Sequence, residues 1–163
     1  MTRPLLKLPS SAVVACLLAF GLAAPALAGH YYLSDVPELV DEAQVAALAA
    51  REIMTTEDLL EHTASRRGRA RLGRALSLPA TTMLSWARFC DLLRIDGIGP
   101  RVVRLLQAAG VADVAQLARL DPAKDIERLE ATNKEHQLIH VMPGQEQIEE
   151  WVVAARRLPV IVK

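Results

Sequence analysis

The stretch "LLRIDGIGPRVVRLL", residues 92–106, decides the fold of this chain. Apolar residues at helical spacing lie on both sides of a short break, "DGIGP", at residues 96–100. Glycine permits a positive φ in a tight turn, and proline suits the first position of a helix. The pattern therefore predicts two helices joined by a hairpin. That hairpin is either a plain turn or a backbone nest for a phosphate.

The composition favours helices throughout. The 163 residues are 52% hydrophobic but only 4% aromatic, and alanine and leucine dominate the apolar set. Strands would need more β-branched and aromatic residues than this chain has. We therefore expect an all-α single domain with a small helical core.

The first 28 residues have the features of a signal peptide. Arg3 and Lys7 precede an apolar run at residues 12–22, and "ALA" at residues 26–28 matches a cleavage site. The sequence thus predicts export to the periplasm or to the medium. Residues 29–34 then form an extended lead, and residues 35–163 form the helical domain.

Two alternatives to cleavage after Ala28 remain open, and both also place the protein outside the cytosol. The apolar run is either an uncleaved membrane anchor or a lipoprotein signal ending at Cys16. With the signal removed, Cys90 is the only cysteine, so no intramolecular disulfide is expected. Cys90 shares a helical pattern with Trp86, Phe89 and Leu93, which predicts a buried and inert thiol.

Charge is distributed unevenly along the mature chain. Residues 35–62 carry eight acidic side chains and one arginine, whereas residues 66–104 carry nine arginines and two aspartates. The basic block runs into the hairpin and begins with an arginine-rich helix bearing Arg66, Arg67, Arg69 and Arg71. Those arginines form either the solvated face of that helix or part of a binding patch.

A weak internal repeat relates two halves of the domain, residues 35–78 and 79–163. Four positions have similar counterparts 58 residues later: Leu48, Ile53, Thr55 and Leu59 align with Leu106, Val111, Asp113 and Leu117. The counterpart of the hairpin in the first half, "ELVDE" at residues 38–42, contains no glycine. Only the second half therefore keeps a hairpin suited to an anion.

Local signals predict where the helices begin and end. Asp41, Thr55 (with Asp58 in a capping box), Ser65 and Asp113 are predicted N-caps. Pro79 and Pro100 suit first helical turns, and Gly110 predicts a C-terminal cap. The first helix is expected over residues 41–53 and the last over residues 145–158, and Trp86 and Trp151 are expected in the core.

The stretch "IDGIGPRVVRLLQAAGVADVAQLARLDP", residues 95–122, resembles a helix-hairpin-helix unit. Together with the arginine-rich helix, "LSWARFCDLLRIDGIGP" at residues 84–100 and "ATNKEHQLIHVMPGQEQIEEWV" at residues 131–152, it resembles the bacterial and archaeal family called domain of unknown function 4332. The resemblance covers nearly all of the mature chain. It implies an all-helical tandem hairpin fold and supplies no established activity.

Helix-hairpin-helix units contact nucleic-acid phosphates without regard to sequence, or they serve as rigid corners and protein contacts. Carried over by position, the phosphate contacts would be the backbone amides of Gly97, Ile98, Gly99 and Arg101. The side chains of Arg101 and Arg104 would add charge, extended by Arg66, Arg67, Arg69 and Arg71. We expect a module for protein interaction or scaffolding, with weak nucleic-acid binding as the alternative.

No enzymatic activity, cofactor or metal is expected. The sequence shows no nucleophile–base pair, nucleotide-binding glycine loop or catalytic carboxylate pair. His136 and His140 have a metal-binding spacing, but "HQLIH" lacks the glutamate of a zinc-protease motif. These histidines are expected on a solvated helix edge or turn. The partner is an unidentified protein or nucleic acid, with no small-molecule substrate evident and a membrane only through an uncleaved N-terminal segment.

Overall fold

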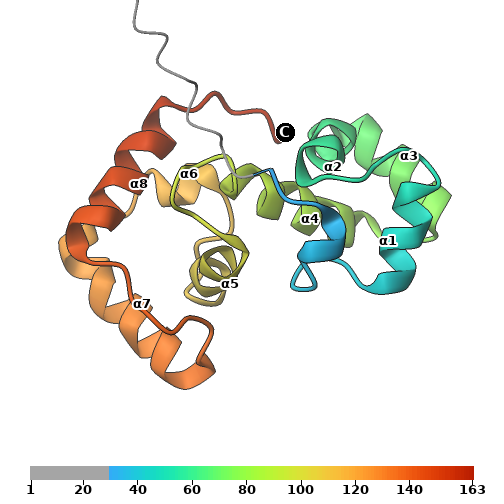
Figure 1. The fold of residues 1–163 in the computed structure, drawn as a ribbon. Helices are drawn as coiled ribbons and strands as arrows, with labels where there is room; N and C mark the ends of the chain where they lie inside the picture. The colour runs from blue at the N-terminus through green and yellow to red at the C-terminus, as the bar shows by residue number, and fades with distance from the viewer. Residues whose placement is uncertain (1–29) are drawn as a thin grey trace, which may run out of the picture.

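The computed structural model describes residues 30–163, so the predicted signal peptide lies outside the described residues. The described chain is helical: a short 3-10 helix, η1 (Leu33–Asp35), precedes eight α-helices (Figure 1). Its only β-type pairing is an isolated bridge between Tyr32 and Thr55. The predicted all-α fold is confirmed. None of the helices in residues 30–163 is long and apolar enough to cross a membrane.

The first half begins its helices at the predicted caps. Its helices are α1 (Glu42–Ala49), α2 (Thr56–Thr63) and α3 (Arg66–Leu76). The side chains of Asp41, Thr55 and Ser65 each accept a hydrogen bond from an amide in the first turn of their helix. Helix α1 ends before the predicted residue 53 because the chain turns left-handed at Glu52, where φ is 62°.

The second half follows the same logic. Its helices are α5 (Pro100–Ala108), α6 (Val114–Leu117), α7 (Pro122–His136) and α8 (Gln145–Arg157). Pro100 takes the first helical position, Gly110 follows α5 with a φ of 84°, and Asp113 caps α6, as predicted. His136 ends α7 and His140 lies in the turn after it, so the two do not share one helix face.

Helix α4 (Ala80–Leu92) is the element that both halves share, and Pro79 is its N-cap. Met83 and Trp86 belong to the apolar core of the first half, whereas Phe89 and Leu92 belong to the core of the second. In Figure 1, α4 lies between α1–α3 and α5–α8. Trp151 is buried in the second core and Trp86 in the first, as predicted. Since α4 contributes side chains to both cores, the structure does not separate the halves at one residue, and the boundary at residue 78 stays a prediction.

The repeat is visible in the backbone hydrogen bonds. After α1, the amides of Glu52 and Ile53 donate to the carbonyls of Ala49 and Leu48. After α5, the equivalent bonds run from Gly110 to Gln107 and from Val111 to Leu106. Each pair closes the end of a helix in the same way. The two halves therefore share one local backbone design at an offset of 58 residues.

The tail at residues 158–163 returns from α8 to the first half. The amide of Lys163 donates to the carbonyl of Ala64 over 3.2 Å, and the Arg69 guanidinium donates to the main-chain oxygen of Lys163. Figure 1 shows this tail running from the end of α8 toward α2. The tail thus ties the two halves together on one side of α4.

Candidate functional site

The hairpin between α4 and α5 uses part of its own hydrogen-bonding capacity. The Gly97 amide donates to Asp96 Oδ1 over 3.0 Å, and the Ile98 amide donates to the Ile95 carbonyl over 3.1 Å. The Ile98 side chain is buried in the second core. Two of the four amides predicted to contact phosphate therefore already have acceptors inside the chain.

Gly97 is required by the packing of the hairpin as well as by its backbone. Its φ is 79°, which L side chains rarely adopt. A Cβ at this position would lie 3.1 Å from Trp151 Nε1 on α8. The hairpin therefore abuts α8 and acts as an internal corner of the second half.

The start of α5 nevertheless keeps free amides. Within residues 30–163, the amides of Gly99, Arg101 and Val102 donate to no acceptor. The equivalent position in the first half holds Asp41, whose carboxylate accepts from the Gln44 amide over 2.8 Å. A side-chain carboxylate thus occupies the anion position of α1, whereas α5 has none.

The two arginines beside the hairpin are accessible. The side chain of Arg101 is 62% exposed, and its Nε lies 3.7 Å from Glu38 Oε1. This contact is long and exposed, so it holds Arg101 only weakly. Arg104 is exposed as well. Both predicted side chains can therefore reach a partner at the start of α5.

Arg69 corrects the prediction of a fully solvated arginine face. Arg66, Arg67 and Arg71 are exposed, but Arg69 is only 7% exposed. Its Nη1 donates to the carbonyls of Thr63 and Ala64, over 2.6 and 2.8 Å. The last carbonyls of a helix lack partners within that helix, and Arg69 satisfies those of α2. It is a structural residue and is not available to phosphate.

The pKa of Arg69 reflects a local crowding of cations. Burial lowers the pKa, and the charges of Arg66 and Arg88 lower it further. Because like charges gather here, the surroundings of Arg69 favour an anion.

The structure does not join the arginine helix to the hairpin. In Figure 1, α3 and α5 lie on different sides of α4. Arg66 and Arg69 of α3 instead border a groove of about 530 Å³, whose lining includes neither Arg67 and Arg71 nor any of the residues 96–101. The single basic surface expected from the sequence is therefore two separate surfaces.

The groove brings together basic side chains from distant parts of the chain. They are Arg66, Arg69, Arg88, Arg119, Arg156 and Lys163. Sequence reasoning missed this site because its walls come from α3, α4, α6, α8 and the tail. The only signal available was the arginine run that begins at Arg66.

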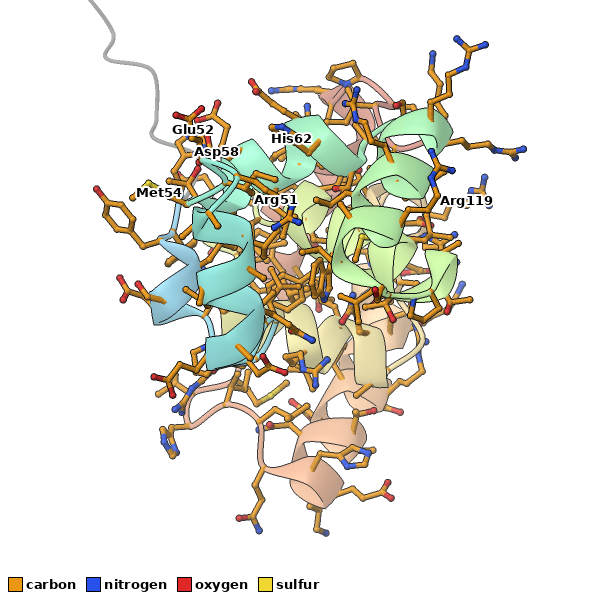
Figure 2. The ribbon with its side chains drawn as sticks, turned by 90° about the vertical axis from the view of Figure 1, so that its right-hand side faces the viewer. Arg51, Glu52, Met54, Asp58, His62 and Arg119 are labelled. Atoms are coloured by element: carbon orange, nitrogen blue, oxygen red, sulfur yellow. The ribbon has the colours of Figure 1, made fainter. Side chains whose placement is uncertain are left out.

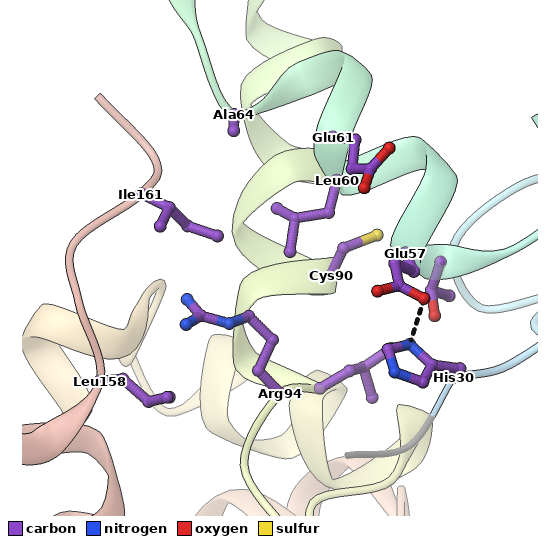
Figure 3. A pocket seen from close by; sticks show the side chains of 11 residues that line it. His30, Glu57, Leu60, Glu61, Ala64, Cys90, Arg94, Leu158 and Ile161 are labelled. Atoms are coloured by element: carbon purple, nitrogen blue, oxygen red, sulfur yellow. Dashed lines mark ion pairs between the residues drawn. The ribbon is translucent and has the colours of Figure 1, made fainter. Parts of the chain in front are cut away.

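A second cavity, of about 490 Å³, is mainly apolar (Figure 3). Leu60, Leu93 and Ile161 line it, and Cys90 lies at its wall. Cys90 is buried, as predicted; burial and the neighbouring charge of Asp91 raise the pKa of its thiol. A thiol that remains protonated is a poor nucleophile, so this cavity offers no activated cysteine.

Two large apolar side chains are exposed on adjoining backbone segments, one before and one after α1. Tyr32 is 61% exposed and Met54 is 54% exposed. The Leu33 amide donates to the Met54 carbonyl over 2.9 Å, which holds the two segments together. Figure 2 shows Met54 close to Glu52 and Asp58. These two exposed residues, with Glu52 and Asp58 nearby, are named here the Tyr32–Met54 patch.

Most of the chain matches a known family model. The model of the family described as Domain of unknown function (DUF4332) matches residues 37–158. No curated protein and no solved structure matches the chain.

Within residues 30–163, no group of three or more potential metal ligands is present.

Proposed function

Because the chain belongs to the DUF4332 family, which carries no assigned activity, we propose a function from its surfaces. The chain is an exported, non-enzymatic helix-hairpin-helix-type module that acts in protein–protein interaction or scaffolding. The observation that carries this proposal is the inward direction of the hairpin. Ile98 is buried, Gly97 abuts Trp151, and two of the hairpin amides already have acceptors within the chain.

The Tyr32–Met54 patch is the proposed contact surface. Exposed aromatic and methionine side chains are enriched at the centres of protein interfaces. The nearby Glu52 and Asp58 favour a partner with a basic surface, since opposite charges speed association and fix orientation. The partner is thus a protein whose apolar contact residues are flanked by lysine or arginine.

Cross-linking in the envelope fraction tests this function. The wild-type chain should capture one protein in stoichiometric yield. The double variant Tyr32→Ser and Met54→Ser should lose most of that capture, because the patch supplies the apolar contact. Val141→Ser is the control, since Val141 is 84% exposed and lies outside the patch. Equal capture by all three chains, or a captured species that nuclease releases, contradicts the proposal.

Weak, sequence-independent binding of nucleic acid through the hairpin is the second candidate. It is favoured by the free amides of Gly99 and Arg101 and by the exposed side chains of Arg101 and Arg104. A phosphate at the start of α5 would use the same helix terminus that Asp41 uses at α1.

A salt titration against mixed-sequence duplex DNA tests this alternative. If it holds, affinity falls steeply with added salt, because each phosphate contact releases counterions. Arg101→Glu with Arg104→Glu should then abolish binding, while the matched pair Arg67→Glu with Arg71→Glu, on the separate α3 surface, should preserve most of it. Gly97→Val is less suited as a test, because it also disturbs the contact with Trp151.

A further inference from the structure

The arginine groove lies where the two halves and the tail meet. Its walls are α3, α4, α6, α8 and residues 158–163, and its volume is about 530 Å³. Pockets that hold small organic molecules typically measure about 300–1,000 Å³. The groove is separate from both the hairpin and the Tyr32–Met54 patch, so neither proposed function uses it.

Much of the groove lining is apolar. It includes Leu84, Val114, Ala115, Ala118, Val160 and Val162. Val160 is 71% exposed, which leaves apolar surface in contact with water. Covering such surface with the apolar body of a ligand is favourable.

The acidic side chains of the groove are already neutralised. Asp91 Oδ1 lies 2.6 Å from Arg94 Nη1, and Asp113 Oδ2 lies 3.4 Å from Arg88 Nε. These carboxylates therefore do not compete with a ligand for the remaining cations. The groove keeps a positive field despite containing two aspartates.

Three exposed arginines of the groove have no carboxylate partner among the described residues: Arg66, Arg119 and Arg156. The Arg156 Nε donates to the Ala118 carbonyl over 2.9 Å, which fixes the side chain and leaves its terminal nitrogens free. Figure 2 shows Arg119 at the edge of the molecule, on the side away from Glu52. Guanidinium groups pair with carboxylate, sulfonate and phosphate oxygens through two parallel hydrogen bonds.

We propose that the groove binds a soluble organic anion. Its anionic head is held by Arg66, Arg119 and Arg156, and its apolar body lies on Leu84, Val160 and Val162. The ligand is an amphiphile with one acyl or aromatic body and one carboxylate, sulfonate or phosphate group. This binding goes beyond the proposed protein interaction and does not depend on it.

Anilinonaphthalene sulfonate is a suitable probe because it combines an aromatic body with a sulfonate. The wild-type chain should bind it saturably, with a rise in fluorescence, and monomeric dodecyl phosphate should displace it. Arg66→Glu with Arg156→Glu should weaken binding roughly tenfold, because each change replaces an attraction with a repulsion. The control, Arg67→Glu with Arg157→Glu, changes the adjacent exposed arginines on the same two helices and should alter affinity less than about twofold.

Several outcomes overturn the proposal. These are no saturable binding, equal loss in the two double variants, or equal binding of the uncharged analogue phenylnaphthylamine. Binding to phosphatidylglycerol vesicles without binding to dodecyl phosphate also overturns it, since the ligand would then be a membrane. Thermal unfolding by circular dichroism shows whether each variant is folded. If the groove variant is not, Arg119→Glu replaces it, because Arg119 is exposed and its side chain makes no hydrogen bond within residues 30–163.

Discussion

The two halves of the molecule close the ends of α1 and α5 with the same backbone hydrogen bonds but with different residues. Position 52 is glutamate with a φ of 62°, and its equivalent, position 110, is glycine with a φ of 84°. Position 41 is an aspartate that caps α1, and its equivalent, position 99, is a glycine that caps α5 without a side chain. At these two pairs of positions the backbone conformation is similar although the residues differ. At the hairpin it is not: Gly97 has a φ of 79°, whereas its counterpart Leu39 has no positive φ.

The largest expected effect tests whether the two cores are equivalent. Leu48 and Leu106 occupy matching positions, and neither side chain is more than 1% exposed. Leu48→Ala and Leu106→Ala should each lower the free energy of unfolding by about 3 kcal/mol, because each leaves a cavity. Urea unfolding measures both values. A loss below about 1 kcal/mol in one half would show that its core is not packed like the other.

Arg69 should show the next largest effect because the second half has no equivalent of it. Arg69→Met removes the donor that serves the last carbonyls of α2 and the tail, and should cost about 3 kcal/mol. The residue 58 positions later is Glu127, which is exposed. Glu127→Met should change stability by less than about 0.5 kcal/mol. Equal effects in urea unfolding would contradict the structural role of Arg69.

The left-handed positions at the ends of α1 and α5 sharpen the comparison. Gly110→Ala should lower stability by about 1–2 kcal/mol, because alanine is strained at this φ. Steric overlap adds little, since the nearest atom to a new Cβ would be Arg128 Nη1 at 3.6 Å. Glu52→Gly should instead raise stability by roughly 0.5 kcal/mol, as relief of strain exceeds the added chain entropy. Calorimetry measures both changes in stability. If the two substitutions changed stability in the same direction, positions 52 and 110 would not be equivalent.

The two halves should also differ, by a smaller amount, in how their stability depends on acidic pH. At matching positions, Asp58 and Gln116 accept hydrogen bonds from the amides of Met54 and Ala112. Partial burial acts to raise the pKa of Asp58, but the amides of Met54 and Thr55, the Thr55 hydroxyl and the charge of His62 outweigh it, so the pKa is lowered.

The sign of the acid effect follows from that lowered pKa. The carboxylate stabilises the folded state above its ordinary pKa, and this contribution is lost as the pH falls through the lowered value. Asp58→Asn should make the melting temperature less sensitive to pH in this acidic range, with a total effect below about 1 kcal/mol, the usual worth of a helix cap. Gln116→Asn at the matching position should leave the pH dependence unchanged. Melting curves recorded from neutral to acidic pH compare the two.

The features that could be predicted from the sequence are local. The caps at Asp41, Thr55 and Asp113 depend on residues within one turn, and the left-handed end at Gly110 depends on the backbone freedom of a single residue. The repeat was visible because it preserves apolar positions at a fixed spacing.

Features that depend on distant segments could not be predicted. Arg69 is buried because a tail 94 residues away returns to it. The Ile98 amide donates to the Ile95 carbonyl, and Gly97 packs against Trp151 of α8. Neither contact could be read from the hairpin sequence. The groove needs residues of α3, α6 and α8 to border one space, which no local pattern in the sequence encodes.

The binding of duplex DNA by the wild-type chain and by Gly99→Asp tests the central claim most directly. Gly99 has φ and ψ of −91° and 171°, close to the −84° and 170° of Asp41, and a new Cβ would meet only Tyr31 Oη at 3.6 Å. The variant should therefore fold and place a carboxylate on the free amides of α5. A module for protein interaction should show no saturable binding of DNA at low salt in either form. Saturable binding by the wild-type chain that Gly99→Asp weakens tenfold or more would contradict the account and assign the hairpin to phosphate.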